Sequence, residues 1–527
     1  MRESKYREEI NSLIRELEEH DHFSVIEATL NNLATSETDQ KKALMRMPWT
    51  QFLLLKLALM GNSGSKKITL SRFNHYANRL YSIQIHAAGL EADSIIRQLR
   101  PMLLQQLWYQ KNADSTLLTI FRQSVLFCGK NPWYANEFRK ISGLDLRNFY
   151  TITTFILLDL KNHKKSMLDI NIFQLLHKLC PGIPYPEILN YFKLIGIRTA
   201  DLPSYAAAHR LKDIYPSEYF QDTPFKNRPI LINGEQLIIF EKNLFITSIT
   251  ELIPELLKKI QGYKDNFGHD FERYIDNIFT HSQIPFWREK PDLENFYKKH
   301  NIRGKIVDFL FQINNHTILI ESKAIEPSPI AKTASDPELL KKILDDSFIK
   351  AIKQGVHSAY WISKTEKFNN NTFSLLIVTH LDFGIYGGRW ISDHVDFEIS
   401  TWIKETYPDV PLSLDDVIYC TIADLEDLLR GHVAGIYQFS DIIKKSSTKD
   451  IEPSQQLMTF AQVISQHLTA PAEHHTQLKE EMDKSLTTFS DLILKNPAFW
   501  GKNYSKLISV RNHCIGELNA NKFTPRM

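Results

Sequence analysis

Three ionisable residues interrupt two apolar runs near the middle of the chain. The segment KIVDFLFQINNHTILIESKA (305–324) carries Asp308 in its first run and both Glu321 and Lys323 in its second. The runs are rich in Ile, Val and Phe and flank Asn314-Asn315, which predicts a hairpin with a two-residue turn, because asparagine tolerates left-handed backbone. In that register Asp308 and Glu321 face one another on adjacent strands.

Facing carboxylates need an explanation, because side chains at facing positions have Cβ atoms roughly 4.5–5.5 Å apart and like charges there destabilise a sheet. Alternation along the strands adds Lys323 to the face of Asp308 and Glu321, and turns Val307 and Ser322 to the other face. A hard divalent cation takes oxygen ligands from such carboxylates, and a neighbouring lysine can position a water. This is the chemistry of phosphodiester hydrolysis. The alternative is that both carboxylates end strands in solvent, with Lys323 as a simple ion-pair partner.

Two flanking helices would bring further polar groups to the hairpin. The segment NFGHDFERYIDNIF (266–279) has an apolar helical face with Glu272 at its edge, so this carboxylate can look towards the sheet. Residues 336–355 begin with an Asp-Pro pair typical of a helix N-terminus. We expect Gly355 to end that helix, with Gln354 in its last turn.

This pattern resembles the PD-(D/E)xK nuclease superfamily in its order and spacing. It consists of a helix glutamate, a strand aspartate, a Glu-x-Lys on the next strand and a helix ending in Lys-Gln. The resemblance covers roughly residues 265–390, about a quarter of the chain. Val307 stands where a proline frequently precedes the aspartate. The resemblance implies a restriction-endonuclease-like core.

The same resemblance implies a nuclease dependent on Mg²⁺ or Mn²⁺, with DNA as the favoured substrate. Asp308 and Glu321 would hold the metal, and Glu272 would assist a metal or its water. Lys323 would orient the nucleophile, and Gln354 would support the site. The β element ahead of the core also resembles large bacterial proteins of this superfamily, several of which serve in defence against foreign DNA such as that of phage.

A basic cluster precedes the aspartate strand. It comprises Lys298, Lys299, Arg303 and Lys305, which could grip a phosphate backbone at the catalytic edge. The alternative is a solvated loop, since charge runs are usually surface features. Residues 161–165, Lys-Asn-His-Lys-Lys, are a weaker candidate for the same contact.

The expected fold class is α/β. A restriction-endonuclease-like core, a mixed sheet flanked by helices, follows a large all-helical N-terminal domain and precedes a mostly helical C-terminal region. The Asn233-Gly234 pair predicts a second hairpin before the core. The predicted divisions are a helical domain at 1–222, a small β linker element at 223–264, the nuclease core at 265–400 and the C-terminal region at 401–527.

The composition limits the kinds of partner that we expect this chain to bind. The chain has 63 basic and 61 acidic residues, a formal net charge of +2, so a nucleic-acid footprint must be local. Its four cysteines lie far apart, and the charged N-terminus has no apolar signal-peptide core. We therefore expect a cytoplasmic protein that binds nucleic acid and no membrane, with a protein partner or a second copy of itself as a further possibility.

Two alternatives to an active nuclease stay open. The first is a nucleic-acid-binding or scaffold subunit with an inactive nuclease fold. The second is a helical partner-binding protein whose α/β part only contributes surface.

Overall fold

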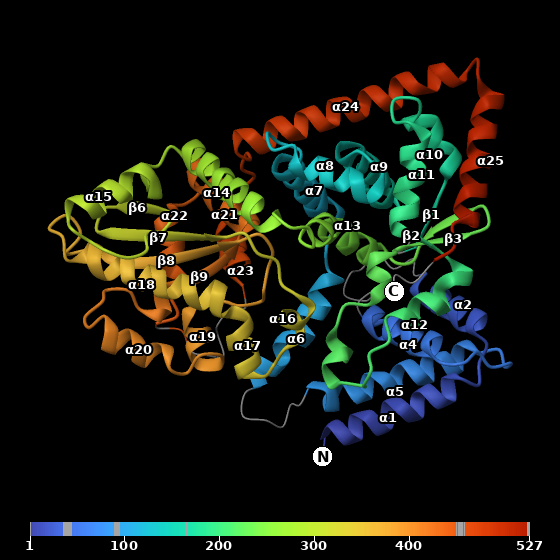
Figure 1. Cartoon of the computed structure of the whole chain (residues 1–527), viewed down its shortest axis with the longest axis horizontal. Coiled ribbons are helices and arrows are strands. Elements are labelled where there is room, and N and C mark those ends of the chain that lie inside the picture. Colours follow the sequence, from blue (N-terminus) through green and yellow to red (C-terminus); the bar gives the residue numbers. More distant parts are fainter. Residues whose placement is uncertain are drawn as a thin grey trace. The chain divides into compact units, whose positions relative to one another are not determined.

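The computed structural model describes residues 2–34, 45–88, 95–163, 167–449, 451, 457 and 459–523. Its contacts divide the chain into two compact units, Met1–Ile260 with Glu481–Met527, and Gln261–Glu480 (Figure 1). The division differs from the predicted boundaries. The last segment, Glu481–Met527, belongs to the first unit. Local sequence patterns do not reveal such a long-range association.

The first unit is mostly helical. Its helices are α1 (Arg2–Leu17), α2 (His22–Leu33), α4 (Pro48–Met60), α5 (Leu70–Ala88), α6 (Ile95–Trp108), α7 (Ala113–Phe127), α8 (Trp133–Ser142), α9 (Leu146–Asn162), α10 (Ile172–Leu179), α11 (Tyr185–Ile195), α12 (Leu202–Ala208), α13 (Lys242–Leu257) and α25 (Tyr504–Ala520), with short 3₁₀ turns η1 (Thr199–Asp201), η2 (Pro216–Phe220) and η3 (Pro224–Asn227). Helix α24 (Thr476–Trp500) starts in the second unit and continues into the first.

The first unit also contains a sheet, so the prediction of an all-helical N-terminal domain is wrong. Four strands lie in the order β1 (Leu168–Ile170), β4 (Gln236–Ile239), β3 (Ile230–Asn233) and β2 (Gly196–Arg198). The predicted hairpin is present as β3 and β4, but Asn233 pairs with Gln236, so the turn is Gly234-Glu235. Gly234 has a φ of 62°, which glycine adopts without strain. Because this hairpin pairs with β1 and β2, residues 223–260 are part of the first unit and not a separate linker.

The second unit contains residues 265–400, where the sequence predicts the core. Its strands are β5 (Phe286–Arg288), β6 (Phe309–Ile313), β7 (His316–Lys323), β8 (Thr372–Thr379) and β9 (Val417–Thr421). Its helices are α14 (Tyr263–Ser282), α15 (Glu294–Lys299), α16 (Pro329–Thr333), α17 (Pro337–Leu344), α18 (Lys350–Ser363), α19 (Gly388–His394), α20 (Ile399–Thr406), α21 (Ile422–Val433), α22 (Phe439–Lys445) and α23 (Phe460–His467), with single turns η4 (Glu289–Leu293), η5 (Asp345–Ile349) and η6 (Leu414–Asp416).

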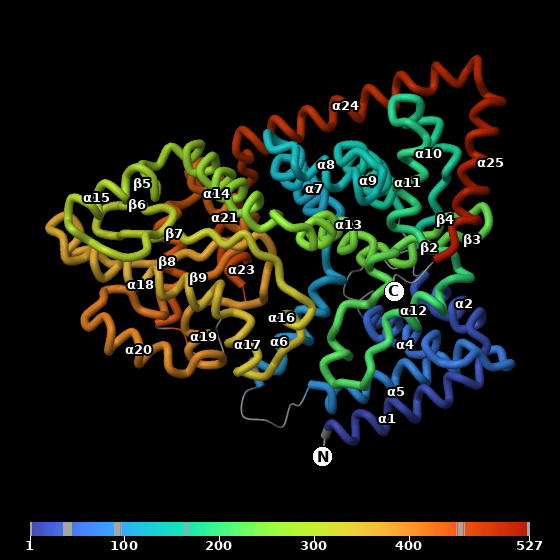
Figure 2. Tube along the Cα trace, viewed as in Figure 1, coloured from blue at the N-terminus to red at the C-terminus, as the bar shows by residue number. Residues whose placement is uncertain are grey.

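The five strands form one mixed sheet in the order β5-β6-β7-β8-β9 (Figure 2). Strands β5, β6 and β7 are antiparallel neighbours, whereas β8 and β9 continue parallel to β7. The predicted hairpin register is confirmed, because Ile313 pairs with His316 and Phe309 with Ile320. Asn314 adopts a φ of 52°, as its place in the turn requires.

Helices cover both faces of this sheet (Figure 1). Phe279 of α14 packs edge-on against Phe309 and Phe311 at centroid distances of 5.1 and 4.8 Å. Leu310 and Leu319 belong instead to the core built with α18. Successive residues of β6 therefore point to opposite faces of the sheet, with aromatic side chains towards α14 and leucines towards α18. This arrangement makes the chain a mixed α/β protein with two mixed sheets.

The C-terminal part contributes to both units. Strand β9 and helix α21 complete the core sheet and its cover, and Thr421 and Asp424 form a capping box at the start of α21. The predicted break at residue 400 therefore cuts through one folded unit. Within the described residues, none of the helices is both long enough and apolar enough to cross a membrane.

Candidate functional site

Asp308 lies at a bend directly before β6. Its Oδ2 accepts hydrogen bonds from the backbone N–H and the hydroxyl of Ser322, both at 2.6 Å. The prediction that Ser322 and Val307 point away from the face of Asp308 is wrong, since Val307 packs in the same core as Leu319. The reason is that regular alternation begins only at Phe309, so the bend places Asp308 at the end of the sheet.

Glu321 is the most deeply buried acid of the hairpin, with only 1% of its surface exposed. Its Oε1 accepts a hydrogen bond from Lys323 Nζ at 2.5 Å. Its Oε2 is buried and has no hydrogen-bond partner among the described residues. Burial, then the charge of Asp308, raises the pKa of Glu321 to about 8 despite the lysine. An orphaned buried oxygen is costly, so this carboxylate is suited to a ligand.

Glu272 is a residue of α14, and the charge of Asp308 acts on it. The side chain is half-buried. Burial raises its pKa first, and the charges of Asp308 and Glu289 raise it further. Glu272 and Asp308 therefore interact electrostatically, although they lie on elements that are distant in sequence.

Glu289 is a carboxylate of this group that the sequence analysis missed. It follows strand β5, and its backbone N–H donates to the carbonyl oxygen of Asp308 at 2.7 Å. Burial and the charge of Asp308 raise its pKa. The only sequence signal was the run Phe286-Trp287-Arg288, which is too short to predict a strand.

Gln354 lies in a different setting from the predicted one. Helix α18 continues past it to Ser363, so the expectation that Gly355 ends the helix is wrong. A Cβ on Gly355 would lie 2.4 Å from Leu375 Cδ2, so this glycine allows α18 to approach β8. Gln354 is half-buried, and no hydrogen bond among the described residues joins it to the carboxylates.

The basic residues ahead of Asp308 are exposed to solvent, and α15 ends among them. They are Lys298, Lys299, Arg303 and Lys305. Lys298 lies 4.0 Å from Glu294, a distance at which a surface pair contributes little. The loop therefore keeps its positive charge available on the surface.

Lys161, from the weaker basic candidate at 161–165, and the buried His475 both have structural partners. Lys161 pairs with Asp114 at 2.6 Å, and Lys164 and Lys165 lie outside the described residues. His475 is buried and shares a hydrogen bond with Tyr274 at 3.0 Å.

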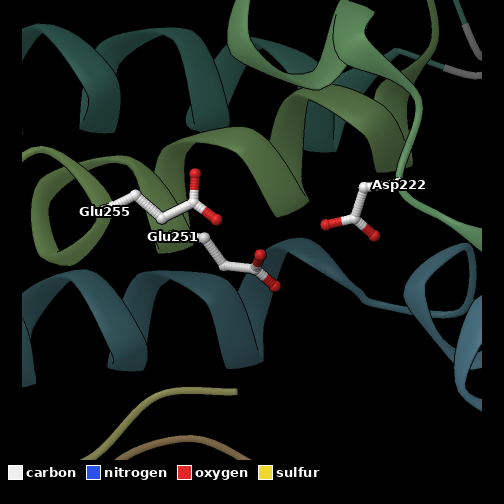
Figure 3. Close-up of side chains that lie close together, drawn as sticks. All are labelled: Asp222, Glu251 and Glu255. Carbon is white, nitrogen blue, oxygen red and sulfur yellow. The ribbon is translucent and has the colours of Figure 1, made fainter. Parts of the chain in front are cut away.

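A second acidic group lies in the first unit, where Asp222, Glu251 and Glu255 have carboxylate oxygens within 4.8 Å of one another (Figure 3). Among the described residues, it is the only group of at least three His, Cys, Asp or Glu residues that meets this spacing. However, Lys226 Nζ lies 2.5, 2.8 and 3.1 Å from these three acids. The ammonium group takes the position that a cation would need, so this cluster is an ion-pair network.

The carboxylates of the second unit fit a divalent cation by their chemistry. They offer hard oxygen ligands, and the Oε2 of Glu321 is an acceptor that no donor among the described residues satisfies. Their oxygens are more widely spread than those around Lys226, as repulsion between unpaired carboxylates predicts. Comparison of the chain with protein-family models, with curated proteins and with solved structures gives no match.

Proposed function

We propose that the second unit is a nuclease of restriction-endonuclease-like fold that hydrolyses phosphodiester bonds with Mg²⁺ or Mn²⁺. The observation that carries this proposal is the buried, unpartnered Oε2 of Glu321 next to Lys323 and close to Asp308. The mixed sheet with the acids on the β6–β7 hairpin supports the fold, because it follows the order of elements that the resemblance implies.

Asp308 and Glu321 would hold the cation, with Glu272 assisting. When bound, the cation would polarise the scissile phosphate and lower the pKa of a water. Ser322 keeps the Asp308 carboxylate in place through two hydrogen bonds. Lys323 holds Glu321 in the same way, and its remaining N–H groups can donate to a water or to a phosphate oxygen.

DNA is the proposed substrate, and defence against foreign DNA is the proposed biological role. Both extend the resemblance in the sequence. The exposed cations at 298–305 support a phosphate-backbone contact, because they precede Asp308 directly in the chain and make no close ion pair with any residue that the structure describes.

A nucleic-acid-binding subunit with an inactive site is the second candidate. The ion pair between Lys323 and Glu321 favours it, because it occupies one oxygen of Glu321 and one donor of the lysine. The spread of the carboxylates favours it too, since no three of them meet the spacing found around Lys226.

A cleavage assay on the full chain separates these candidates. Linear and circular DNA and single-stranded RNA would be incubated with Mg²⁺, with Mn²⁺ and with EDTA. An active nuclease cleaves at least one substrate only with the cation, and a Glu405→Gln variant, changed at an exposed acid of α20, cleaves equally well. Binding without cleavage under all conditions would support the inactive subunit instead.

A further inference from the structure

The first unit contains a cavity of about 580 Å³, a volume within the roughly 300–1,000 Å³ of small-molecule sites. Strand β2, helix α12, helix α13 with the turn that follows it, and the chain after α25 form most of its wall; these elements are labelled in Figure 1. Every lining residue belongs to Met1–Ile260 or to Glu481–Met527. The cavity is therefore complete within one unit, and the nuclease proposed above does not use it.

Positive charge exceeds negative charge in the wall of this cavity. Its acids are Asp201 and Glu255, and each already has a cationic partner. Arg198 donates to both carboxylate oxygens of Asp201, at 2.6 and 2.7 Å. Glu255 lies 3.1 Å from Lys226 in the network described above. The cations of the wall are Lys193, Arg198, Arg228, Lys259 and Lys522. The wall therefore favours an anionic ligand.

Two of these cations are available to such a ligand. Lys259 and Lys522 are exposed, and neither makes an ion pair with any residue that the structure describes. Lys193, by contrast, pairs with Glu517 at 3.0 Å, and Arg228 donates to the carbonyl oxygen of Lys193 at 2.6 Å. A lysine ammonium has three donors and forms charge-assisted hydrogen bonds with phosphate oxygens. Lys259 and Lys522 are therefore suited to hold the anionic group of a ligand.

Aromatic and aliphatic side chains form another part of the wall. The rings of Tyr205 and Phe523 pack edge to face, with their centroids 5.0 Å apart. Ile232 and Leu252 line the same cavity. Such surfaces bind the flat or apolar part of a ligand, whereas a few polar groups fix its orientation. A nucleoside phosphate combines a flat heterocycle with an anionic group, so it matches both parts of this wall.

Hydrogen bonds hold the residues after α25 against the rest of the wall. Arg198 Nη1 donates to the carbonyl oxygen of Asn519 at 2.7 Å, and the Phe523 N–H donates to Asp201 Oδ2 at 2.9 Å. These bonds keep Lys522 and Phe523 beside β2 and η1. A preformed site loses less conformational freedom on binding than a site that must be ordered by its ligand.

We propose that this cavity binds a nucleoside phosphate, with Lys259 and Lys522 contacting the phosphate and with Tyr205 and Phe523 beside the base. The cavity belongs to a different unit from the carboxylates of the β6–β7 hairpin. The inference therefore does not depend on the proposed nuclease, and it assigns a ligand-binding function to the first unit.

Isothermal titration calorimetry of the full chain in EDTA tests this inference, because the carboxylates of the second unit repel a nucleotide when no divalent cation is present. The probes are AMP, GMP, CMP and UMP, their four nucleosides, and inorganic phosphate. We expect at least one nucleotide to bind once per chain. Its nucleoside and inorganic phosphate should each bind at least about 10-fold more weakly, because each lacks one part of the ligand. The inference is overturned if no nucleotide binds, or if the nucleoside or phosphate alone binds as tightly.

Substitutions of two neighbouring lysines locate the binding site. Lys259→Ala combined with Lys522→Ala should weaken binding of that nucleotide by about 10-fold or more. Lys258→Ala is the matched control, because Lys258 is also exposed but does not line the cavity, and it should bind like the parent. Both lysines of the double variant are exposed, so without nucleotide it should melt at the same temperature as the parent. Parent-like binding by the double variant, or an equal loss in Lys258→Ala, would overturn the inference.

Discussion

The two acidic clusters of this protein differ in how a lysine contacts their carboxylates. In the first unit, three carboxylates lie close together (Figure 3), and Lys226 Nζ lies within 3.1 Å of each of them. In the second unit, Lys323 satisfies one oxygen of Glu321 and leaves the other without a partner. The comparison teaches that a lysine ammonium can take the place of a cation among tightly spaced acids, whereas in the second unit the ammonium of Lys323 is paired with one acid alone.

The largest expected effect is on cleavage. Asp308→Asn should reduce Mg²⁺-dependent cleavage by more than the roughly 10–100-fold typical of groups one step removed from a metal. Its metal-free melting temperature should be unchanged or raised, because the substitution removes a charge that neighbouring acids repel. Cleavage rates and thermal melts in EDTA check both parts. Full activity in the variant would remove Asp308 from the site.

The Lys226 cluster should respond in the opposite way. Lys226→Met leaves buried acids without their cation, and breaking a buried pair costs about 3–5 kcal/mol of stability. Denaturant unfolding monitored by circular dichroism measures this loss. Lys258→Met, at an exposed position that caps α13, should stay within about 0.5 kcal/mol of the parent. Equal stability of the two variants would show that the cluster does not depend on its lysine.

The pH dependence of stability gives a further test of the acidic cluster in the second unit. The pKa of Glu321 is raised to about 8, so the folded protein in EDTA holds this proton more tightly than the unfolded chain does. The resulting stabilisation is complete at low pH and is lost as the pH rises from the ordinary glutamate range to about 8, by up to about 1.4 kcal/mol per pH unit.

Unfolding curves of the parent and Glu321→Gln between pH 5 and pH 9 would reveal this slope as a difference. Glu241 and Asp424, whose pKa values burial raises to about 7, remain in both proteins, so their contributions cancel. Parallel curves would mean that Glu321 is already ionised at neutral pH.

The smallest effect concerns the basic loop. Replacing Lys298 and Arg303 by alanine should weaken DNA binding uniformly across sequences and flatten the log–log salt slope by roughly 1 to 2. Fluorescence anisotropy at several salt concentrations measures the slope. An unchanged slope would identify the loop as solvated surface and move the phosphate contact to another part of the molecule.

Local patterns predicted the hairpin well, because turn chemistry and strand alternation act between near neighbours. The facing positions of Phe309 and Ile320 and the left-handed Asn314 followed from them. The same reasoning failed at the ends of elements. The bend at Asp308 and the continuation of α18 past Gly355 depend on packing against β7 and β8, which no short window contains.

Pairing between distant segments also explains which features of the site could not be predicted from the sequence. Glu289 joins the acids only because the three-residue strand β5 pairs with β6. Helix α25 in the first unit and strand β1 beside β4 likewise join segments that are distant in sequence. The unpartnered oxygen of Glu321 could not be predicted, since it requires knowledge of every neighbour.

The most direct test of the central claim is a paired measurement on the parent and on Glu321→Gln, with Mn²⁺ binding and DNA cleavage followed on the same samples. The parent should bind Mn²⁺ and cleave only with a divalent cation. Glu321→Gln should remain folded, bind at least one ion fewer and lose cleavage. A Glu321→Gln protein that binds Mn²⁺ and cleaves DNA like the parent would contradict the account.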